Sequence, residues 1–222
     1  MNRAYNDSLK AIKESRLVAI LRGVPMEQVE GVVDALLRGG VRVLEFTYDQ
    51  GGDPEKTAQK IRYTAERFGG DVVVGCGTAL TVSEVELAQQ AGASLVVSPD
   101  TNVNVIRRTR ELNMVSMPGA LTPTEIVTAW NAGADIVKLF PAGELGLGYI
   151  KAVRAPLRHI PMSAVGGVKP ENVAEFLNAG VCGFGVGGQL VLPDAVKRGD
   201  YEALAARAAQ FTKAIADWEA AK

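Results

Sequence analysis

The chain has 222 residues, of which 47% are hydrophobic and 22% are charged, and its formal net charge is −1. This size and apolar content predict a substantial hydrophobic core in one large globular domain or two small ones. The sequence has no long run of Lys or Arg, which argues against binding to nucleic acid or to an anionic membrane. It also has no uninterrupted apolar run of about 18 residues, which excludes a membrane-spanning segment.

Short apolar runs alternate with amphipathic runs along almost the whole chain. Asn2–Ser15 has helical spacing, so residues 1–16 predict a helix that packs on the main fold. Predicted strands then cover Leu17–Leu21, Val41–Phe46, Asp71–Gly75, Ser94–Ser98, Met114–Met117, Asp135–Phe140, Pro161–Val165 and Cys182–Val186. The next predicted helix after Asn2–Ser15 starts at Pro25 and stops at Gly39–Gly40. The other predicted helices cover Pro54–Phe68, Thr81–Ala91, Val103–Leu112, Pro123–Ala132, Leu147–Leu157, Pro170–Ala179 and Asp200–Trp218.

The strands are uniformly apolar, which indicates a parallel sheet covered by helices. Four of the helices end at a glycine that permits a left-handed cap, and no linker interrupts the pattern. Eight strand–helix units predict a single (β/α)₈ TIM barrel over residues 1–222, with a doubly wound open sheet as the alternative.

Polar residues follow several of the predicted strands at their carboxyl ends, where a barrel of this type builds its active site. The first strand ends at Arg22, the second carries Glu45 and Thr47, the third leads into Thr78, and the sixth carries Lys138. Because side chains alternate along a strand, Glu45 and Lys138 are both able to point inward. We therefore expect these residues to meet at one mouth of the barrel.

Lys138 lies in the apolar stretch Asp135–Pro141. Burial of an ammonium group is costly and lowers the pKa of lysine toward the neutral amine. A neutral amine is a nucleophile toward carbonyl groups. The alternative is a lysine at a strand end that extends its ammonium group to solvent.

Glycine pairs follow the last two predicted strands, at Gly166, Gly167, Gly187 and Gly188. Barrels often bind phosphate in these loops, through exposed backbone N–H groups, although the same glycines also suit tight turns. Gly183–Gly188 matches the dinucleotide pattern G-x-G-x-x-G, but no further strand–helix–strand unit follows it. We therefore reject a dinucleotide site.

Histidine and cysteine are scarce in this chain. His159 is the only histidine and precedes a strand at the end opposite the mouth, so the sequence predicts neither a metal nor a cofactor. Cys76 and Cys182 lie far apart without a CxxC pairing, which indicates a reducing compartment and, with no secretion signal, a cytoplasmic protein. The expected partners are small molecules and other copies of the chain.

Six segments in chain order carry a family resemblance: Val18–Gly23, Leu44–Thr47, Gly75–Thr78, Ser98–Pro99, Pro118–Glu125 and Val137–Pro141. Together they resemble the 2-keto-3-deoxy-6-phosphogluconate (KDPG) aldolases, class I enzymes also described as using 4-hydroxy-2-oxoglutarate. The resemblance implies a homotrimeric barrel that cleaves KDPG to pyruvate and glyceraldehyde 3-phosphate. It also implies a Schiff base on Lys138, acid/base catalysis by Glu45, and a carboxylate site that includes Thr78. Thr47, Pro99, Pro118 and Phe140 are the expected pocket residues.

The chain departs from the family pattern at several positions. Some members carry the carboxylate-binding arginine four residues after the glutamate, where this chain has Asp49, so that role passes to Arg22. Many members have a threonine and a serine where this chain has Val165 and Gly188, followed by Gln189. These changes leave open a related acid such as the 6-phosphogalactonate analogue or a non-phosphorylated acid.

Two other function classes fit the same residues. A phosphate-binding barrel isomerase or synthase would use Glu45 and Lys138 as an acid/base pair without a covalent adduct. A non-catalytic binding barrel would show neither adduct nor turnover, but it gives no reason for Arg22, Glu45, Thr78 and Lys138 to meet at one mouth.

Overall fold

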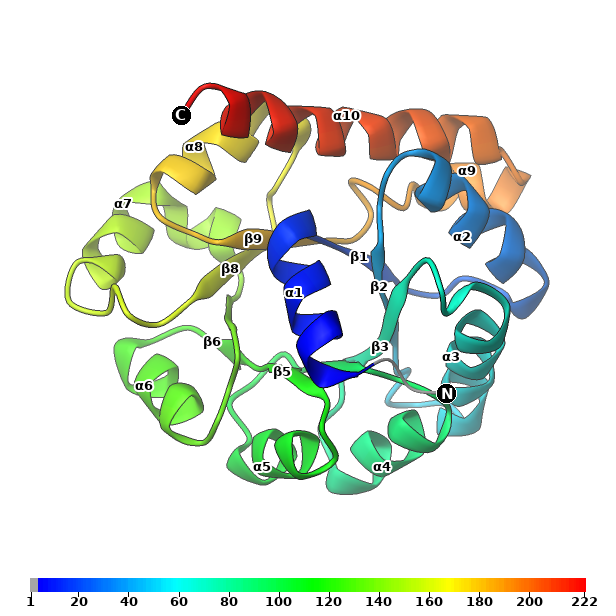
Figure 1. The fold of residues 1–222 in the computed structure, drawn as a ribbon, viewed down its shortest axis with the longest axis horizontal. Helices are drawn as coiled ribbons and strands as arrows, with labels where there is room; N and C mark the ends of the chain where they lie inside the picture. Colours follow the sequence, from blue (N-terminus) through cyan, green and yellow to red (C-terminus); the bar gives the residue numbers. More distant parts are fainter. Residues whose placement is uncertain (1–3) are drawn as a thin grey trace.

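A ring of parallel strands surrounded by helices is the frame of the computed structural model, which describes residues 4–222 (Figure 1). The strands are β1 (Leu17–Leu21), β2 (Val43–Thr47), β3 (Val73–Gly77), β4 (Leu95–Val97), β5 (Val115–Met117), β6 (Gly119–Ala120), β7 (Val137–Leu139), β8 (Met162–Val165) and β9 (Gly183–Val186). They pair in the order β5-β4-β3-β2-β1-β9-β8-β7-β6, with every pair parallel. Because the last strand pairs with the first, the predicted barrel is confirmed and the open doubly wound sheet is excluded.

The fifth predicted strand, Met114–Met117, corresponds to β5, and the chain continues past Pro118 into a second short strand, β6, that closes the ring. β5 pairs with β4, while β6 pairs with β7. Pro118 has no N–H to donate to a ladder, but its carbonyl accepts a hydrogen bond from the N–H of Lys138 at 2.8 Å. The carbonyl of Ser116 likewise accepts from the N–H of Asp135 at 2.9 Å. One run of chain, 115–120, therefore joins both edges of the sheet.

Helices surround the barrel on its outside, except for the first, which lies across one end (Figure 1). They are α1 (Tyr5–Ser15), α2 (Val29–Arg38), α3 (Pro54–Phe68), α4 (Val82–Gln90), α5 (Val103–Glu111), α6 (Pro123–Asn131), α7 (Ala142–Arg154), α8 (Val173–Asn178), α9 (Pro193–Arg198) and α10 (Tyr201–Ala220). Within residues 4–222, each helix is either too short or too polar to cross a membrane.

Several element boundaries differ from the sequence-based expectation. The helices expected from Pro25 and Pro170 start as short 3₁₀ turns, at Met26–Gln28 and Pro170–Asn172. α7 starts at Ala142 rather than near Leu147, and a break at Gly146, where φ is 75°, separates its first turn from the amphipathic part. α9 has six residues, too few for a helical period to be visible in the sequence.

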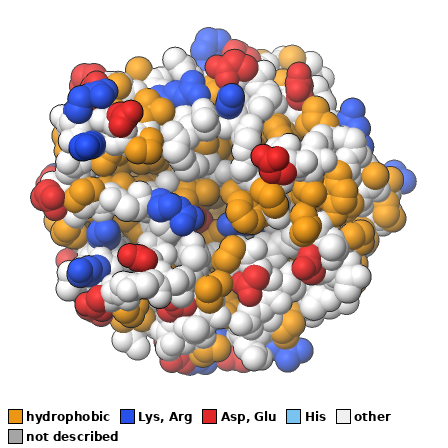
Figure 2. All heavy atoms as spheres, turned by 180° about the vertical axis from the view of Figure 1, so that it is seen from behind, with side chains coloured by type: hydrophobic (Ala, Val, Ile, Leu, Met, Phe, Trp, Pro, Cys, Tyr) orange, Lys and Arg blue, Asp and Glu red, His pale blue; other side chains and the backbone are white. Residues whose placement is uncertain are grey.

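α1 closes one end of the barrel, and two cores result. Residues 2 and 3 of the predicted helix lie outside the described residues. Ile12 of α1 packs in the barrel interior with residues near the amino ends of the strands, among them Val18, Val43 and Val73. A larger outer core lies between the strands and the surrounding helices. Figure 1 views the barrel from the α1 end, so Figure 2 shows the opposite face, to which the carboxyl ends of the strands point.

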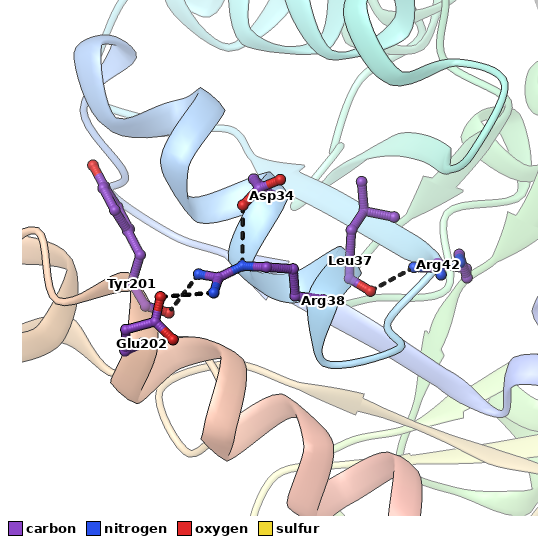
Figure 3. A network of polar contacts seen from close by, with 6 residues as sticks. All are labelled: Asp34, Leu37, Arg38, Arg42, Tyr201 and Glu202. Carbon is purple, nitrogen blue, oxygen red and sulfur yellow. Dashed lines mark hydrogen bonds and ion pairs between the residues drawn. The ribbon is translucent and has the colours of Figure 1, made fainter.

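A small polar network and close packing join α2 to α10, the first and last helices of the ring. Arg38 on α2 contacts Asp34 at 3.1 Å on its own helix and Glu202 on α10 at 2.7 Å (Figure 3). The helices approach closely at Gly39, where a Cβ would lie 2.3 Å from that of Ala208. Exposed ion pairs contribute little individually to stability, so close packing contributes most to the association of α2 with α10.

Candidate active site

Two ionisable side chains point into the barrel between apolar neighbours. On β2, both sequence neighbours of Glu45 belong to the outer core, and both neighbours of Lys138 on β7 do as well. Side chains alternate along a strand, so Glu45 and Lys138 face the interior. Val43 and Ile136, two residues earlier on the same faces, belong to the interior core that α1 covers. Glu45 and Lys138 therefore lie above that core, toward the open mouth.

Glu45 is 2% exposed, and its carboxylate lies against Gly77 on β3. A Cβ at Gly77 would lie 2.3 Å from Glu45 Oε1, so the glycine makes room for the carboxylate. Burial raises the pKa of Glu45 to about 7 because the charged form loses its water, while Lys138 and Arg22 act in the opposite direction. A carboxyl group that titrates near neutrality is suited to accept a proton and return it.

Lys138 is 7% exposed. Burial lowers the pKa of its ammonium group; the nearby carboxylate of Glu45 opposes this change, and the positive charge of Arg22 adds to it. The Nζ atom lies 5.0 Å from the centre of the Phe140 ring, a cation–π distance. The lower pKa increases the fraction of neutral amine, which is the nucleophilic form.

A cavity of about 390 Å³ lies beside the carboxyl ends of the first three strands; it is lined by Arg22, Gly23, Thr47, Tyr48, Asp49, Gln50 and Thr78. The guanidinium of Arg22 and the hydroxyls of Thr47 and Thr78 offer several hydrogen-bond donors to a carboxylate. Glu45 and Lys138 lie deeper and do not line this cavity, but both interact electrostatically with Arg22.

Arg22 is exposed and also lines a second cavity of about 310 Å³. Val191, Pro193, Val196 and Lys197 form the side of this cavity that follows β9. The arginine therefore stands between the two spaces and is able to reach a ligand in either.

Two glycine-rich loops follow β8 and β9, which are neighbours in the sheet. Gly166 and Gly167 adopt φ values of 96° and 72°, and a Cβ at Gly143 of α7 would lie 2.8 Å from Gly167 Cα. In the described chain, the N–H groups of Gly166, Gly167, Gly187 and Gly188 donate to no protein oxygen. Free N–H groups on adjacent loops are what a phosphate group binds.

The remaining expected pocket residues, Pro99, Pro118 and Phe140, differ in burial and in the contacts that they make. Pro118 is buried, and its carbonyl supports the N–H of Lys138. The backbone carbonyl of Pro99 packs against Gly119, which leaves no space for a Cβ there. Phe140 is 40% exposed at the end of β7. These prolines shape the strand ends through their backbone, whereas Phe140 presents its ring to solvent.

Sequence reasoning missed three residues around this site. Gly77 belongs to a segment with family resemblance, but its contact with Glu45 requires the neighbouring strand. Gln50 lies in a loop without periodicity, and its amide bonds to the carbonyl of Thr78 at 2.7 Å. Ser163 pairs in register with Lys138 on the adjacent strand, and its buried hydroxyl lacks a hydrogen-bond partner among the described residues. Tertiary contacts alone show what each of the three does at this site.

The weaker candidates lie apart from this chemistry. Cys76 is fully buried, and burial raises the pKa of its thiol, which keeps it unreactive. His159 is exposed and stacks edge-on with Trp130 at 6.3 Å between ring centres. Among residues 4–222, no group of three or more His, Cys, Asp or Glu side chains is placed to hold a metal ion.

Comparison with known proteins gives a consistent picture. The family model described as KDPG and KHG aldolase matches residues 9–207. The probable 2-dehydro-3-deoxy-6-phosphogalactonate aldolase of Rhizobium meliloti (strain 1021) is 39% identical over 181 residues, which are 81% of this chain and 84% of that protein. The 2-dehydro-3-deoxy-6-phosphogalactonate aldolase of Escherichia coli (strain K12) is 36% identical over 199 residues, 89% of this chain and 93% of that protein.

A phosphogluconate enzyme is also similar. The 2-dehydro-3-deoxy-phosphogluconate aldolase of Treponema pallidum (strain Nichols) is 31% identical over 213 residues, 93% of this chain and 96% of that protein. Among solved structures, one described as native KDPGal superposes with a TM-score of 0.82 at 35% identity, covering 92% of this chain and 96% of that chain.

Proposed function

Because the chain belongs to the KDPG and KHG aldolase family, we propose that it is a class I aldolase in which Lys138 forms a Schiff base with a 2-keto acid. The observation that supports this proposal most directly is the pairing of two buried groups with opposite pKa shifts. Burial lowers the pKa of Lys138 and raises that of Glu45 to about 7, so a nucleophilic amine faces a proton acceptor in one enclosed space.

The reaction starts when neutral Lys138 attacks the C2 carbonyl of a 2-keto-4-hydroxy acid. Loss of water gives an iminium ion, which is an electron sink. Glu45, directly or through a water, takes the proton of the C4 hydroxyl, and the electrons of the C3–C4 bond move into the iminium to form an enamine. The aldehyde leaves, C3 takes up a proton, and hydrolysis of the iminium returns pyruvate and free Lys138.

The ends of the substrate meet two different sets of donors. Arg22 and Thr78 bind the carboxylate and keep C2 facing Lys138, because a guanidinium presents paired N–H donors to a carboxylate. The free N–H groups of Gly166 and Gly167, with those of the β9 loop, bind the phosphate at the other end.

We further propose that the substrate is 2-keto-3-deoxy-6-phosphogalactonate. Two relatives named for this substrate are 39% and 36% identical to the chain, whereas two phosphogluconate aldolases are 31% and 29% identical. KDPG, the C4 epimer, is the second candidate, because the relative named for it covers 93% of the chain. Both acids yield pyruvate and glyceraldehyde 3-phosphate, so the epimers differ only in how the C4 hydroxyl meets Glu45.

Borohydride reduction with pyruvate, followed by peptide mass spectrometry, tests the covalent step. We expect a reduced adduct on Lys138 in the native chain and none in Lys138→Ala. A folded native chain without adduct, or an active Lys138→Ala enzyme, would refute the Schiff base. Pyruvate release from the two epimers then decides the substrate, and a higher kcat/KM for KDPG would overturn the galactonate proposal.

A further inference from the structure

We propose that Gln50 is a positioning residue of this site: its side-chain amide holds Thr78 in the backbone conformation that turns the threonine toward the cavity for the substrate carboxylate. The proposal rests on the Schiff-base function above and assigns a role to the loop after β2. It starts from the backbone of Thr78, which has a φ of 58°. A β-branched residue in the left-handed region is strained, and such strain persists only where neighbouring contacts enforce it.

Gln50 provides one of these contacts through a single amide group. Its Nε2 donates to the carbonyl of Thr78 at 2.7 Å and to Oε1 of Glu84 at 2.8 Å. The other oxygen of Glu84 accepts from the N–H groups of Leu80 at 2.8 Å and Thr81 at 2.9 Å. The carboxylate of Glu84 therefore ties Gln50 to the start of α4, and the chain between them is fixed at both ends.

Tyr48, two residues before Gln50, strengthens the same attachment. The N–H of Tyr48 donates to the carbonyl of Gly77 at 2.8 Å, and its hydroxyl donates to the carbonyl of Glu84 at 2.9 Å. The loop after β2 thus holds the segment 77–84 at several points. Tyr48 is buried and contributes to the fold, whereas Gln50 is exposed and lies outside both cores. A change at Gln50 is therefore expected to alter the position of Thr78 without unfolding the barrel.

The test measures the pyruvate concentration that half-saturates borohydride trapping on Lys138. In Gln50→Glu the side chain no longer donates and is repelled by Glu84, so we expect this concentration to rise about tenfold. Gln50→Met has similar length but no donor or charge, and it should change the value in the same direction. The trapping rate at saturating pyruvate should stay within about twofold, because the amine itself is not disturbed. Gln59→Glu, the same substitution on an exposed face of α3, serves as the matched control.

A double-mutant cycle separates positioning from direct contact, because Gln50 also lines the cavity. If Gln50 acts through Thr78, Gln50→Glu has no further effect on half-saturation in a Thr78→Ala background. An equal tenfold loss in that background would mean that Gln50 contacts the keto acid itself, and would overturn the proposal. Unchanged half-saturation in Gln50→Glu and Gln50→Met would overturn it as well. If the native chain forms no adduct, both the Schiff base and this inference are refuted. If the native chain forms the adduct and the Gln50 variants trap pyruvate normally, only this inference is refuted.

Discussion

Gly77→Ala perturbs the proposed proton acceptor, Glu45, without replacing a titratable residue. The new Cβ would lie 2.3 Å from Glu45 Oε1 and 2.8 Å from its Cδ, against an ordinary contact of at least 3.4 Å. The carboxylate must therefore move by about 1 Å, and a displacement of about 1 Å at a reacting group costs roughly 100-fold in rate. That loss corresponds to about 2.7 kcal/mol of transition-state stabilisation. Gly77 does not have a positive φ, so alanine suits its backbone.

Steady-state pyruvate release and borohydride trapping together check this prediction. We expect kcat to fall roughly 100-fold while pyruvate is still trapped on Lys138, because the atoms nearest the new Cβ belong to Glu45 and Thr47. The melting temperature should change little, since the atoms that give way are the flexible end of a side chain. Gly70→Ala, where a Cβ meets nothing within 4 Å, is the matched control. Full activity in Gly77→Ala would refute the reasoning, as would the loss of trapping in a stably folded variant.

Three further predictions follow from the same structure. The folded-state pKa of Glu45 is raised from 4.5 to about 7, so its charged form destabilises the fold as the pH rises through that window. The free energy of unfolding of Glu45→Gln, measured with urea, should therefore equal that of the native chain near pH 4 and exceed it near pH 8 by up to about 3 kcal/mol. Asp135 accepts hydrogen bonds from Tyr5 of α1 at 2.5 Å, from the N–H of Ser116 at 2.8 Å and from Arg110 at 3.1 Å. Tyr5→Phe should cost about 1 kcal/mol in the same assay and Asp135→Ala about 3 kcal/mol, because the alanine removes the acceptor from all three donors. In Gly143→Ala the Cβ would lie 2.8 Å from Gly167 Cα, and the displaced loop should raise KM for the phosphorylated acid about tenfold with unchanged pyruvate trapping.

Each of these predictions has a contrary result. A stability difference for Glu45→Gln that does not vary between pH 4 and pH 8 would contradict the raised pKa. Equal losses of unfolding free energy in Tyr5→Phe and Asp135→Ala would mean that Asp135 stabilises the fold only through its bond to Tyr5 of α1. An unchanged KM in Gly143→Ala would place the phosphate away from the Gly166–Gly167 turn.

Local pattern was sufficient to predict most of the fold. Apolar runs of strand length alternate with amphipathic runs, and the predicted boundaries agree with the structure closely at Leu17–Leu21 and Pro54–Phe68. The misses fall where the local signal is weak or interrupted. Six residues of α9 are too few to show a period, and Gly146 breaks α7 so that only its second part appears amphipathic.

The sequence by itself determined that Glu45 shares a strand face with Val43, and that Lys138 shares one with Ile136, because alternation along a strand is a property of the extended backbone. The tertiary structure decided the rest. It buries both groups and shifts their pKa values in opposite directions, a result that depends on every neighbour that excludes water. It also places Gly77 under the carboxylate and Gln50 on the carbonyl of Thr78. These contacts join residues from different strands and loops, and no local period specifies them.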